Sequence, residues 1–379
     1  MRALDGIKVV SIERDIAAPF CTSRLADAGA TVLTIDHRNS DLVPSPDAST
    51  PEPIGCLAWL NRGKSSIALD FATEIGRQTL ERLIATADVF MQNLGPGAMD
   101  ALGFPLERLC SAYPGLICCN ISAFGDTGPY AHRRTSDNLI QAESGLASIT
   151  GGPEEPAVAG IPIIELATGA TAHAAVLEAL IARGLTGNGA DIQISMFDVI
   201  ADWLTAPLLN AEAGRSPKRT GLVHPLHAPH GVFRSKDGKN ILVSIRSDGE
   251  WTRLCLEVLE APTLPDDPRF RTAADRIRNR RATDQAVSDV FATYSRGSLV
   301  RRLTDAKIAF ADVNTMADLS AHPHLRRVTA ETSDGRVSFP APAPIVIGES
   351  RNYGVAPGWQ SSDRSGPQLT AAFTLIARD

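Results

Sequence analysis

In GIKVVSIERDIAAPFCTSRLADAGATVLTID, residues 6–36, two apolar runs flank a stretch of helical character. GIKVVSIE and ATVLTID predict strands, because short apolar runs rich in Val and Ile are typical of buried strands. Residues 18–29 between them predict a helix. Two strands joined through a helix run parallel, so this opening predicts the first unit of an α/β fold.

The same alternation continues over the first 125 residues. Three further strands are predicted at SSIALD, DVFMQN and GLICCNIS, separated by the helical stretches TEIGRQTLERLIATA and PLERLCSAYP. The first of these helices should place Ile75, Leu80, Leu83 and Ile84 on one side. GLICCNIS is apolar enough to be buried on both faces of a sheet. Together these elements predict a Rossmann-like, doubly wound parallel sheet.

The rest of the chain predicts a discontinuous large domain and a smaller α+β domain. Residues 1–205 form the N-terminal part of the large domain and end in Ala-rich helices around a strand at ADIQIS. Residues 206–225, rich in Gly, Pro and basic residues, are expected to be a linker. Residues 226–320 begin with a hairpin around Asp237 and Gly238 and form the small domain. Residues 321–379 are expected to return to the large domain.

Composition limits the classes of partner. The chain has 379 residues, 44% of them hydrophobic, and a net charge of -6. No general positive field is available to bind nucleic acid. No run approaches the ~18 to 20 apolar residues of a membrane span, and acidic residues precede any signal-like stretch, so we expect a cytoplasmic protein without membrane contact.

No metal site is expected. His224, His227 and His230 follow one another in steps of three, but Pro225 and Pro229 prevent a regular helix that would align them. The six cysteines lie without CxxC spacing, mostly in apolar contexts, and are expected to be reduced.

Two features mark possible ligand positions. The turn Gly95–Gly97 follows a predicted strand and precedes a helix, where it is either a ligand-binding turn or only a helix start. Glu165 lies in GIPIIELATG, directly after an apolar run and before a helix. A carboxylate there is partly buried, which is costly unless it is hydrogen-bonded or used in chemistry. The alternative is a first-turn glutamate that complements the helix dipole.

Several segments, in order, resemble the class III CoA-transferase family, also called the CaiB/BaiF family. The matching stretches are LDGIKVVSIERDIAAPFCTSRLADAGATVLTID, LNRGKSSIALDF, DVFMQNLGPGAMDALGF, ISAFGDTGPY, DNLIQAESGLASITG, ALIARGLTGNGADIQISMFD and DDPRFRTAADRIRNR. The resemblance implies a Rossmann-like domain built from both ends of the chain, a small domain, and an interlocked homodimer.

The resemblance also implies a site for coenzyme A as the thioester substrate, without a metal. The positions that match the family's CoA-binding residues are Ile16, His37, Arg38, Leu69, Asn93, Leu94 and Arg134. Glu165 stands where the family has a nucleophilic aspartate. It would attack the donor thioester to give a mixed anhydride and then an enzyme-bound glutamyl-CoA thioester. At its ordinary pKa of ~4.3 this glutamate is ionised at pH 7.

Within the family, LNRGKSSIALD, TGGPEEPAVAGIPI and HPHLRR are most similar to the branch that acts on short dicarboxylic acyl-CoAs. Two alternatives remain open. One is a catalytically degenerate CoA-binding paralogue, because of the glutamate at position 165. The other, less favoured, is an α-methylacyl-CoA racemase, which carries a histidine where this chain has Ser136, just before Asp137.

Overall fold

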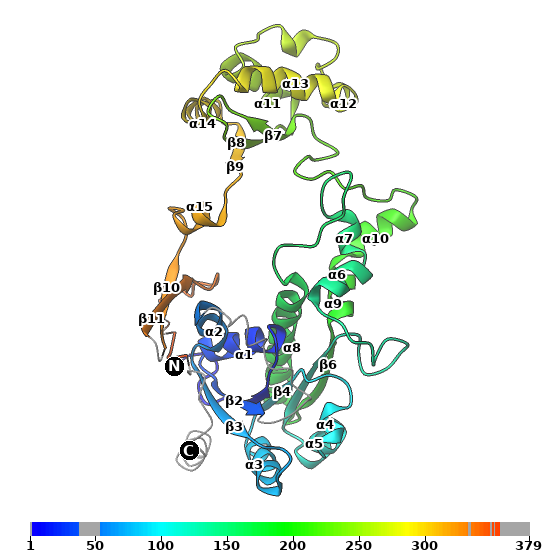
Figure 1. The fold of residues 1–379 in the computed structure, drawn as a ribbon, viewed down its shortest axis with the longest axis vertical. Coiled ribbons are helices and arrows are strands. Elements are labelled where there is room, and N and C mark those ends of the chain that lie inside the picture. The colour runs from blue at the N-terminus through cyan, green and yellow to red at the C-terminus, as the bar shows by residue number, and fades with distance from the viewer. Residues whose placement is uncertain (1, 38–53, 333–334, 349–350, 352, 357–379) are drawn as a thin grey trace. The chain divides into compact units, whose positions relative to one another are not determined.

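The computed structural model describes residues 2–37, 54–332, 335–348, 351 and 353–356 (Figure 1). The chain divides into two compact units. The first unit comprises Met1–Leu146, Ala159–Ser216 and Arg326–Asp379, and the second comprises Ala147–Val158 and Pro217–Leu325. Relative to the expected segments, residues 147–158 group with the second unit and residues 206–216 with the first.

The first unit contains a six-stranded parallel sheet, as the alternation of strands and helices predicts. Its strand order is β3-β2-β1-β4-β5-β6. The strands are β1 (Lys8–Ile12), β2 (Thr31–His37), β3 (Lys64–Leu69), β4 (Val89–Gln92), β5 (Ile117–Ser122) and β6 (Ala190–Ser195). The order reverses direction between β1 and β4, and ligands of doubly wound folds bind outside the carboxyl ends of the strands at such a point.

Helices cover both faces of this sheet. On one face lie α1 (Ala17–Asp27) and α8 (Ile163–Thr186), and on the other lie α3 (Glu74–Ala85), α4 (Ala98–Ala101) and α5 (Leu106–Ala112) (Figure 1). Successive strand residues point to opposite faces, so Val9 belongs to the first core and Val10 to the second. All six residues of β5 are buried, which confirms the expectation for GLICCNIS.

Helix α3 corrects one detail of the predicted core. Leu80, Leu83 and Ile84 are fully buried, but Ile75 is 71% exposed. Five residues before Leu80 correspond to roughly 500° of helical rotation, which places Ile75 away from the apolar face. Gly76, four residues before Leu80, takes the buried position instead.

The remaining elements of the first unit extend this layer structure. They are α2 (Ile54–Asn61), α6 (Asp137–Glu143), α9 (Met196–Trp203), α10 (Thr205–Glu212), β10 (Arg327–Thr332) and β11 (Gly335–Pro340). β10 and β11 pair antiparallel and pack against α2. The short helix α7 (Leu146–Ile149) lies at the boundary between the units.

The second unit is built on a three-stranded antiparallel sheet. Its strands are β7 (His230–Arg234), β8 (Asn240–Ser244) and β9 (Ala309–Asp312). β7 and β8 form the expected hairpin, with Gly238 at a φ of 75° in the turn. Its helical segments are α11 (Asp248–Arg253), the π-helical turn Leu254–Val258, the 3-10 turn Leu264–Asp266, α12 (Ala273–Arg278), α13 (Arg280–Phe291), α14 (Arg296–Asp305) and α15 (Met316–Ser320).

Helix α8 is the longest element of the described chain, and it corrects the expectation about apolar runs. By length and composition alone it could cross a membrane, although no run was expected to reach that length. It packs against α1, β5, β6 and α9. Ala167, Ala172 and Val176 contribute to the core between α8, α1 and the sheet.

The contact between α8 and α1 depends on a glycine. A Cβ atom at Gly169 would lie 2.4 Å from the Ala17 carbonyl oxygen and 3.1 Å from the Phe20 Cβ. Gly169 therefore allows the two helices to approach closely at the beginning of α1. Gly184, near the end of the same helix, has open space around its added Cβ atom.

We expect Gly169→Ala to destabilise the protein by about 2 kcal/mol, because overpacking a close helix contact forces the backbones apart. Gly184→Ala is the matched control and should stabilise it by about 0.5 to 1 kcal/mol, since alanine is the better helix former. Urea unfolding of both variants provides the measurement. Equal effects of the two substitutions would contradict the proposed close contact.

Candidate active site

The turn between β1 and α1 presents free backbone donors. The first hydrogen bond within the helix runs from the Phe20 amide to the Ile16 carbonyl, so the preceding amides have no acceptor in their own helix. Pro19 has no amide hydrogen and is well suited to this first turn. Asp15, just before Ile16, has a φ of 52°. The amides of Ile16 and Ala17, which follow this left-handed residue, converge on one point.

Glu165 occupies that point. Its Oε2 atom accepts hydrogen bonds from the amides of Ile16, at 2.6 Å, and Ala17, at 3.2 Å. No hydrogen bond from the described residues reaches Oε1. The carboxylate therefore has one oxygen fixed by two backbone donors, while the other is available to a reactant.

Asp137 fixes the helix that carries Glu165. Its Oδ2 atom accepts hydrogen bonds from the amides of Ile164 and Glu165, both at 2.9 Å, at the beginning of α8. Its Oδ1 atom accepts a bond of 2.6 Å from the Gln141 side chain. Asp137 thus satisfies two amides that the helix itself leaves unbonded. In the sequence, Asp137 is marked only as the residue after Ser136, the racemase position, and no pattern indicates its role as a cap of α8.

The environment of Glu165 changes its acidity. Burial is the main cause that raises its pKa to about 7, and the negative charges of Asp15 and Asp137 act in the same direction. The amides of Ile16 and Ala17 oppose the shift by binding the carboxylate. The expectation of an ordinary pKa, with full ionisation at pH 7, is therefore wrong.

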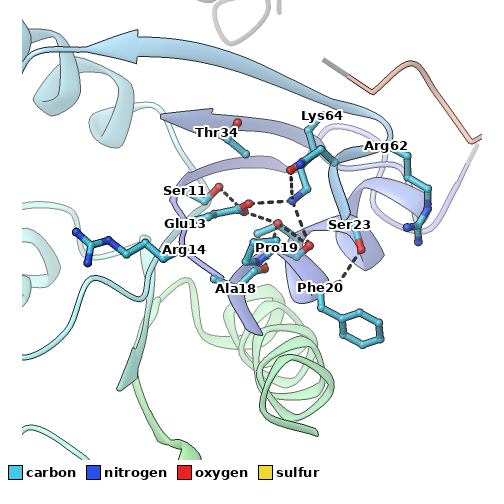
Figure 2. Close-up of polar contacts among 12 residues, drawn as sticks. Ser11, Glu13, Arg14, Ala18, Pro19, Phe20, Ser23, Thr34, Arg62 and Lys64 are labelled. Carbon is cyan, nitrogen blue, oxygen red and sulfur yellow. Dashed lines mark hydrogen bonds and ion pairs between the residues drawn. The ribbon is translucent and has the colours of Figure 1, made fainter. Parts of the chain in front are cut away.

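A buried ion pair joins the chain before this turn to the first turn of α1 (Figure 2). Lys64 Nζ donates to Glu13 Oε2 at 2.9 Å and to the Pro19 carbonyl at 3.1 Å. Glu13 Oε1 accepts hydrogen bonds from Ser11 Oγ, at 2.8 Å, and from Thr22 Oγ1. The pair connects β1 and β3 to the first turns of α1. No sequence pattern marks either residue as functional, because the two lie 51 residues apart in the chain.

The residues expected to bind CoA follow several strands at one edge of the sheet. Ile16 follows β1, His37 and Leu69 end β2 and β3, and Asn93 and Leu94 follow β4. Parallel strands bring these positions to the same carboxyl edge. Arg134 is exposed in the segment before α6, and Arg38 lies outside the described residues.

One of these residues, Asn93, bonds the backbone of the β1–α1 turn. The Asn93 side chain accepts from the Arg14 amide at 2.7 Å and donates to the Arg14 carbonyl at 2.8 Å. The Leu94 amide donates to Gln92 Oε1 at 2.8 Å. Asn93 therefore holds the β1–α1 turn from the side of β4.

Two other features that the sequence marks are the turn Gly95–Gly97 and the three histidines. Gly95 and Gly97 have φ values of 102° and 75° and lead into the four-residue helix α4. The rings of His224 and His227 stack with centroids 4.5 Å apart. No group of three histidine, cysteine or acidic residues in the described part of the chain is arranged to hold a metal ion.

A six-stranded doubly wound sheet with a semi-buried carboxylate beside its switch point defines an α/β protein with an acid of raised pKa at the usual ligand edge. The sequence profile of CoA-transferase family III matches residues 4–346, and the chain belongs to this family. It is a CoA-transferase, an enzyme that uses CoA thioesters as substrates.

Named relatives agree with this assignment. The acetyl-CoA:oxalate CoA-transferase of Acetobacter aceti is 31% identical over 375 residues, which cover 97% of this chain and 95% of the relative. The succinate–glutarate CoA-transferase of Agrobacterium fabrum is 30% identical over 361 residues, or 92% and 90% of the two chains. A crystal structure of a CaiB/BaiF family protein from Brucella suis superimposes with a TM-score of 0.85, at 30% identity and 99% coverage of both chains.

Proposed function

We propose that this enzyme transfers CoA from an acyl-CoA thioester to a short dicarboxylic acid, with Glu165 as the nucleophile. The observation that carries the proposal is the Glu165 carboxylate, bound through Oε2 by the amides of Ile16 and Ala17. The same two amides are placed to stabilise negative charge when the glutamyl carbonyl is attacked. Fixed backbone donors of this kind lower the barrier of acyl transfer.

The first half of the reaction moves CoA onto the enzyme. Glu165 Oε1 attacks the thioester carbonyl of the donor. The C–S bond breaks and CoA leaves as a thiolate, which gives a mixed anhydride of Glu165 and the donor acid. The thiolate then attacks the glutamyl carbonyl and releases the donor acid as its carboxylate. The product is a glutamyl-CoA thioester on the enzyme, and no proton is gained or lost overall.

The second half repeats these steps in reverse with the acceptor. The acceptor carboxylate attacks the glutamyl thioester, expels the CoA thiolate and forms a second mixed anhydride. Attack of the thiolate on the acceptor's carbonyl then gives the new acyl-CoA and restores the Glu165 carboxylate. Each half therefore passes through an oxyanion at the glutamyl carbonyl, beside the amides of Ile16 and Ala17.

The substrate class comes from the relatives. Oxalate, succinate and glutarate, which appear in the names of the two relatives, are all short dicarboxylic acids. Two basic residues that follow α10 in the chain, Arg219 and His227, are candidates for holding the distal carboxylate of the acid. The Arg219 guanidinium already donates to the carbonyls of Ser148, Gly152 and Pro153 within the second unit, which favours a structural role for this arginine.

Trapping tests the nucleophile directly. The protein is mixed with succinyl-CoA or itaconyl-CoA and then with hydroxylamine, and peptide mass spectrometry locates the product. We expect a hydroxamate at Glu165 in the wild type, and neither adduct nor turnover in Glu165→Gln, which should still bind CoA. Full activity of Glu165→Gln would disprove the nucleophile. CoA binding without any adduct would favour a degenerate paralogue.

Glu165→Asp adds a test of side-chain length within the same assay. Shortening the side chain withdraws the carboxylate from the amides of Ile16 and Ala17 by roughly 1 Å, so we expect turnover to fall by about 10- to 100-fold. A faster Glu165→Asp enzyme would show a pocket shaped for aspartate.

Activity should depend on pH through the ionisation of Glu165. The carboxylate is the attacking form, and burial with Asp15 and Asp137 nearby raises its pKa to about 7. We therefore expect kcat/KM to be constant above this pKa and to fall about tenfold per pH unit below it. Initial rates between pH 5 and 9 provide the measurement. A constant kcat/KM down to pH 5 would contradict the assignment.

We also propose that the enzyme is a homodimer of interlocked subunits, as the family resemblance implies. The exposed apolar side chains of Ile181 and Leu185 on α8 support a further protein contact there. Sedimentation analysis should give twice the mass of one chain. A stable monomer at micromolar concentration that is fully active would contradict this part of the proposal.

A further inference from the structure

The turn that presents the Ile16 and Ala17 amides is held from three sides. Glu165 binds the two amides, Asn93 binds the backbone of Arg14, and Glu13 is fixed by Lys64. The turn also contains Asp15 in the left-handed region, at a φ of 52°. Residues in this region persist only where the surrounding contacts enforce them. The direction of the two amides thus depends on how firmly both ends of the turn are held.

The Glu13–Lys64 ion pair contacts several elements around this turn. The Lys64 side chain is 0% exposed and that of Glu13 is 7% exposed. Besides Glu13 and the Pro19 carbonyl, the ammonium reaches Asn61 Oδ1 at 3.4 Å. The Glu13 carboxylate in turn contacts β1 through Ser11 (Figure 2). It contacts the second turn of α1 through Thr22. One ion pair therefore joins β1, β3, the end of α2 and the beginning of α1.

Stability alone is a weak explanation for such a pair. Removing two charges from water is costly, and apolar replacements of buried ion pairs are often neutral or stabilising. What apolar side chains cannot provide is the direction of the bonds. The carboxylate accepts from three donors, and the ammonium fixes a carbonyl in the first turn of α1. These bonds define where the chain leaves β1 and where α1 begins.

We propose that Glu13 and Lys64 are positioning residues of the transferase: their ion pair sets the β1–α1 turn so that the amides of Ile16 and Ala17 meet the glutamyl oxygen. This inference rests on the proposed function of Glu165. Neither residue touches the carboxylate of Glu165, and both act through the turn. The loss of the pair should therefore reduce the rate of the chemical steps more than the affinity for the thioester.

The principal test is the double variant Glu13→Gln/Lys64→Met, which removes both charges and leaves neither one buried alone. We expect kcat to fall by about 10- to 100-fold, since a displacement of about 1 Å has an effect of that size. The KM for the acyl-CoA should change less than about threefold. The rate of hydroxylamine-trapped adduct formation at Glu165 should fall in parallel with kcat.

The chain offers a matched control in Asp27→Asn/Arg62→Met. Arg62 and Asp27 form another buried ion pair, with side chains 1% and 3% exposed, between the C-terminal end of α1 and the end of α2. This pair touches α1 ten residues away from Ala17. The control should lower the thermal midpoint to a similar extent but leave kcat within about twofold of the wild type.

Thr22→Val provides a second variant in case the double variant does not fold. It removes only the hydroxyl that donates to Glu13 Oε1 and keeps both charges. We expect kcat, calculated per molecule of folded enzyme that binds acyl-CoA, to fall by about 3- to 10-fold with an unchanged KM. A loss of folded protein alone would leave this normalised kcat at the wild-type value.

The outcomes separate this proposal from the proposed function. If Glu165→Gln is inactive but the folded double variant and Thr22→Val turn over and form the adduct at the wild-type rate, the positioning role is disproved and the nucleophile stands. An equal loss of kcat in the Asp27/Arg62 control would likewise overturn the positioning role, since any buried pair would then have the same effect. If Glu165→Gln remains active, the proposed function itself fails.

Discussion

The hydrogen bonds from the Ile16 and Ala17 amides to Glu165 are the interaction on which the site depends. They join the beginning of α1 to the beginning of α8. Both helices begin with amides that have no acceptor within the helix, and both carry a partial positive charge there. The two helices approach closely enough only because Gly169 has no side chain. The small residue Gly169 in α8 thus allows the carboxylate and its donors to lie close together.

The electrostatics of this arrangement is a balance between opposing effects. Two amides stabilise the ionised form of Glu165, whereas burial and the charges of Asp15 and Asp137 disfavour it, and the net effect is a pKa of about 7. Asp137 holds α8 by accepting two of its amides and also places a negative charge near Glu165, which disfavours the ionised form. The result is a carboxylate that is less stabilised than an ordinary surface glutamate and still ionised in a large fraction of molecules at neutral pH.

The sequence predicts most of the fold but only part of the candidate site. The composition of GLICCNIS predicts a buried strand. The position of Glu165 between an apolar run and a helix indicates a possible site residue. The apolar pattern of α3 predicts Ile75 on the buried face, but Ile75 is exposed. A shift of one position along a helix rotates a side chain by about 100°, which is enough to move it off the apolar face. Glu13 and Lys64 lie 51 residues apart, and their contact exists only after three elements have packed. Aspartate adopts the left-handed conformation more often than most residues, but residue type alone does not distinguish Asp15 from the other aspartates of the chain.

The length of the side chain at position 165 is linked to the rigidity of the turn opposite it. With α8 held against α1 at Gly169 and capped by Asp137, the Cα of residue 165 has little freedom to move toward the turn. The turn has little freedom to move toward residue 165, because Asn93 bonds the backbone of Arg14 and Lys64 bonds Glu13. A gap fixed on both sides selects one side-chain length. The 2.6 Å bond from Ile16 to Glu165 indicates that in this chain the glutamate spans it.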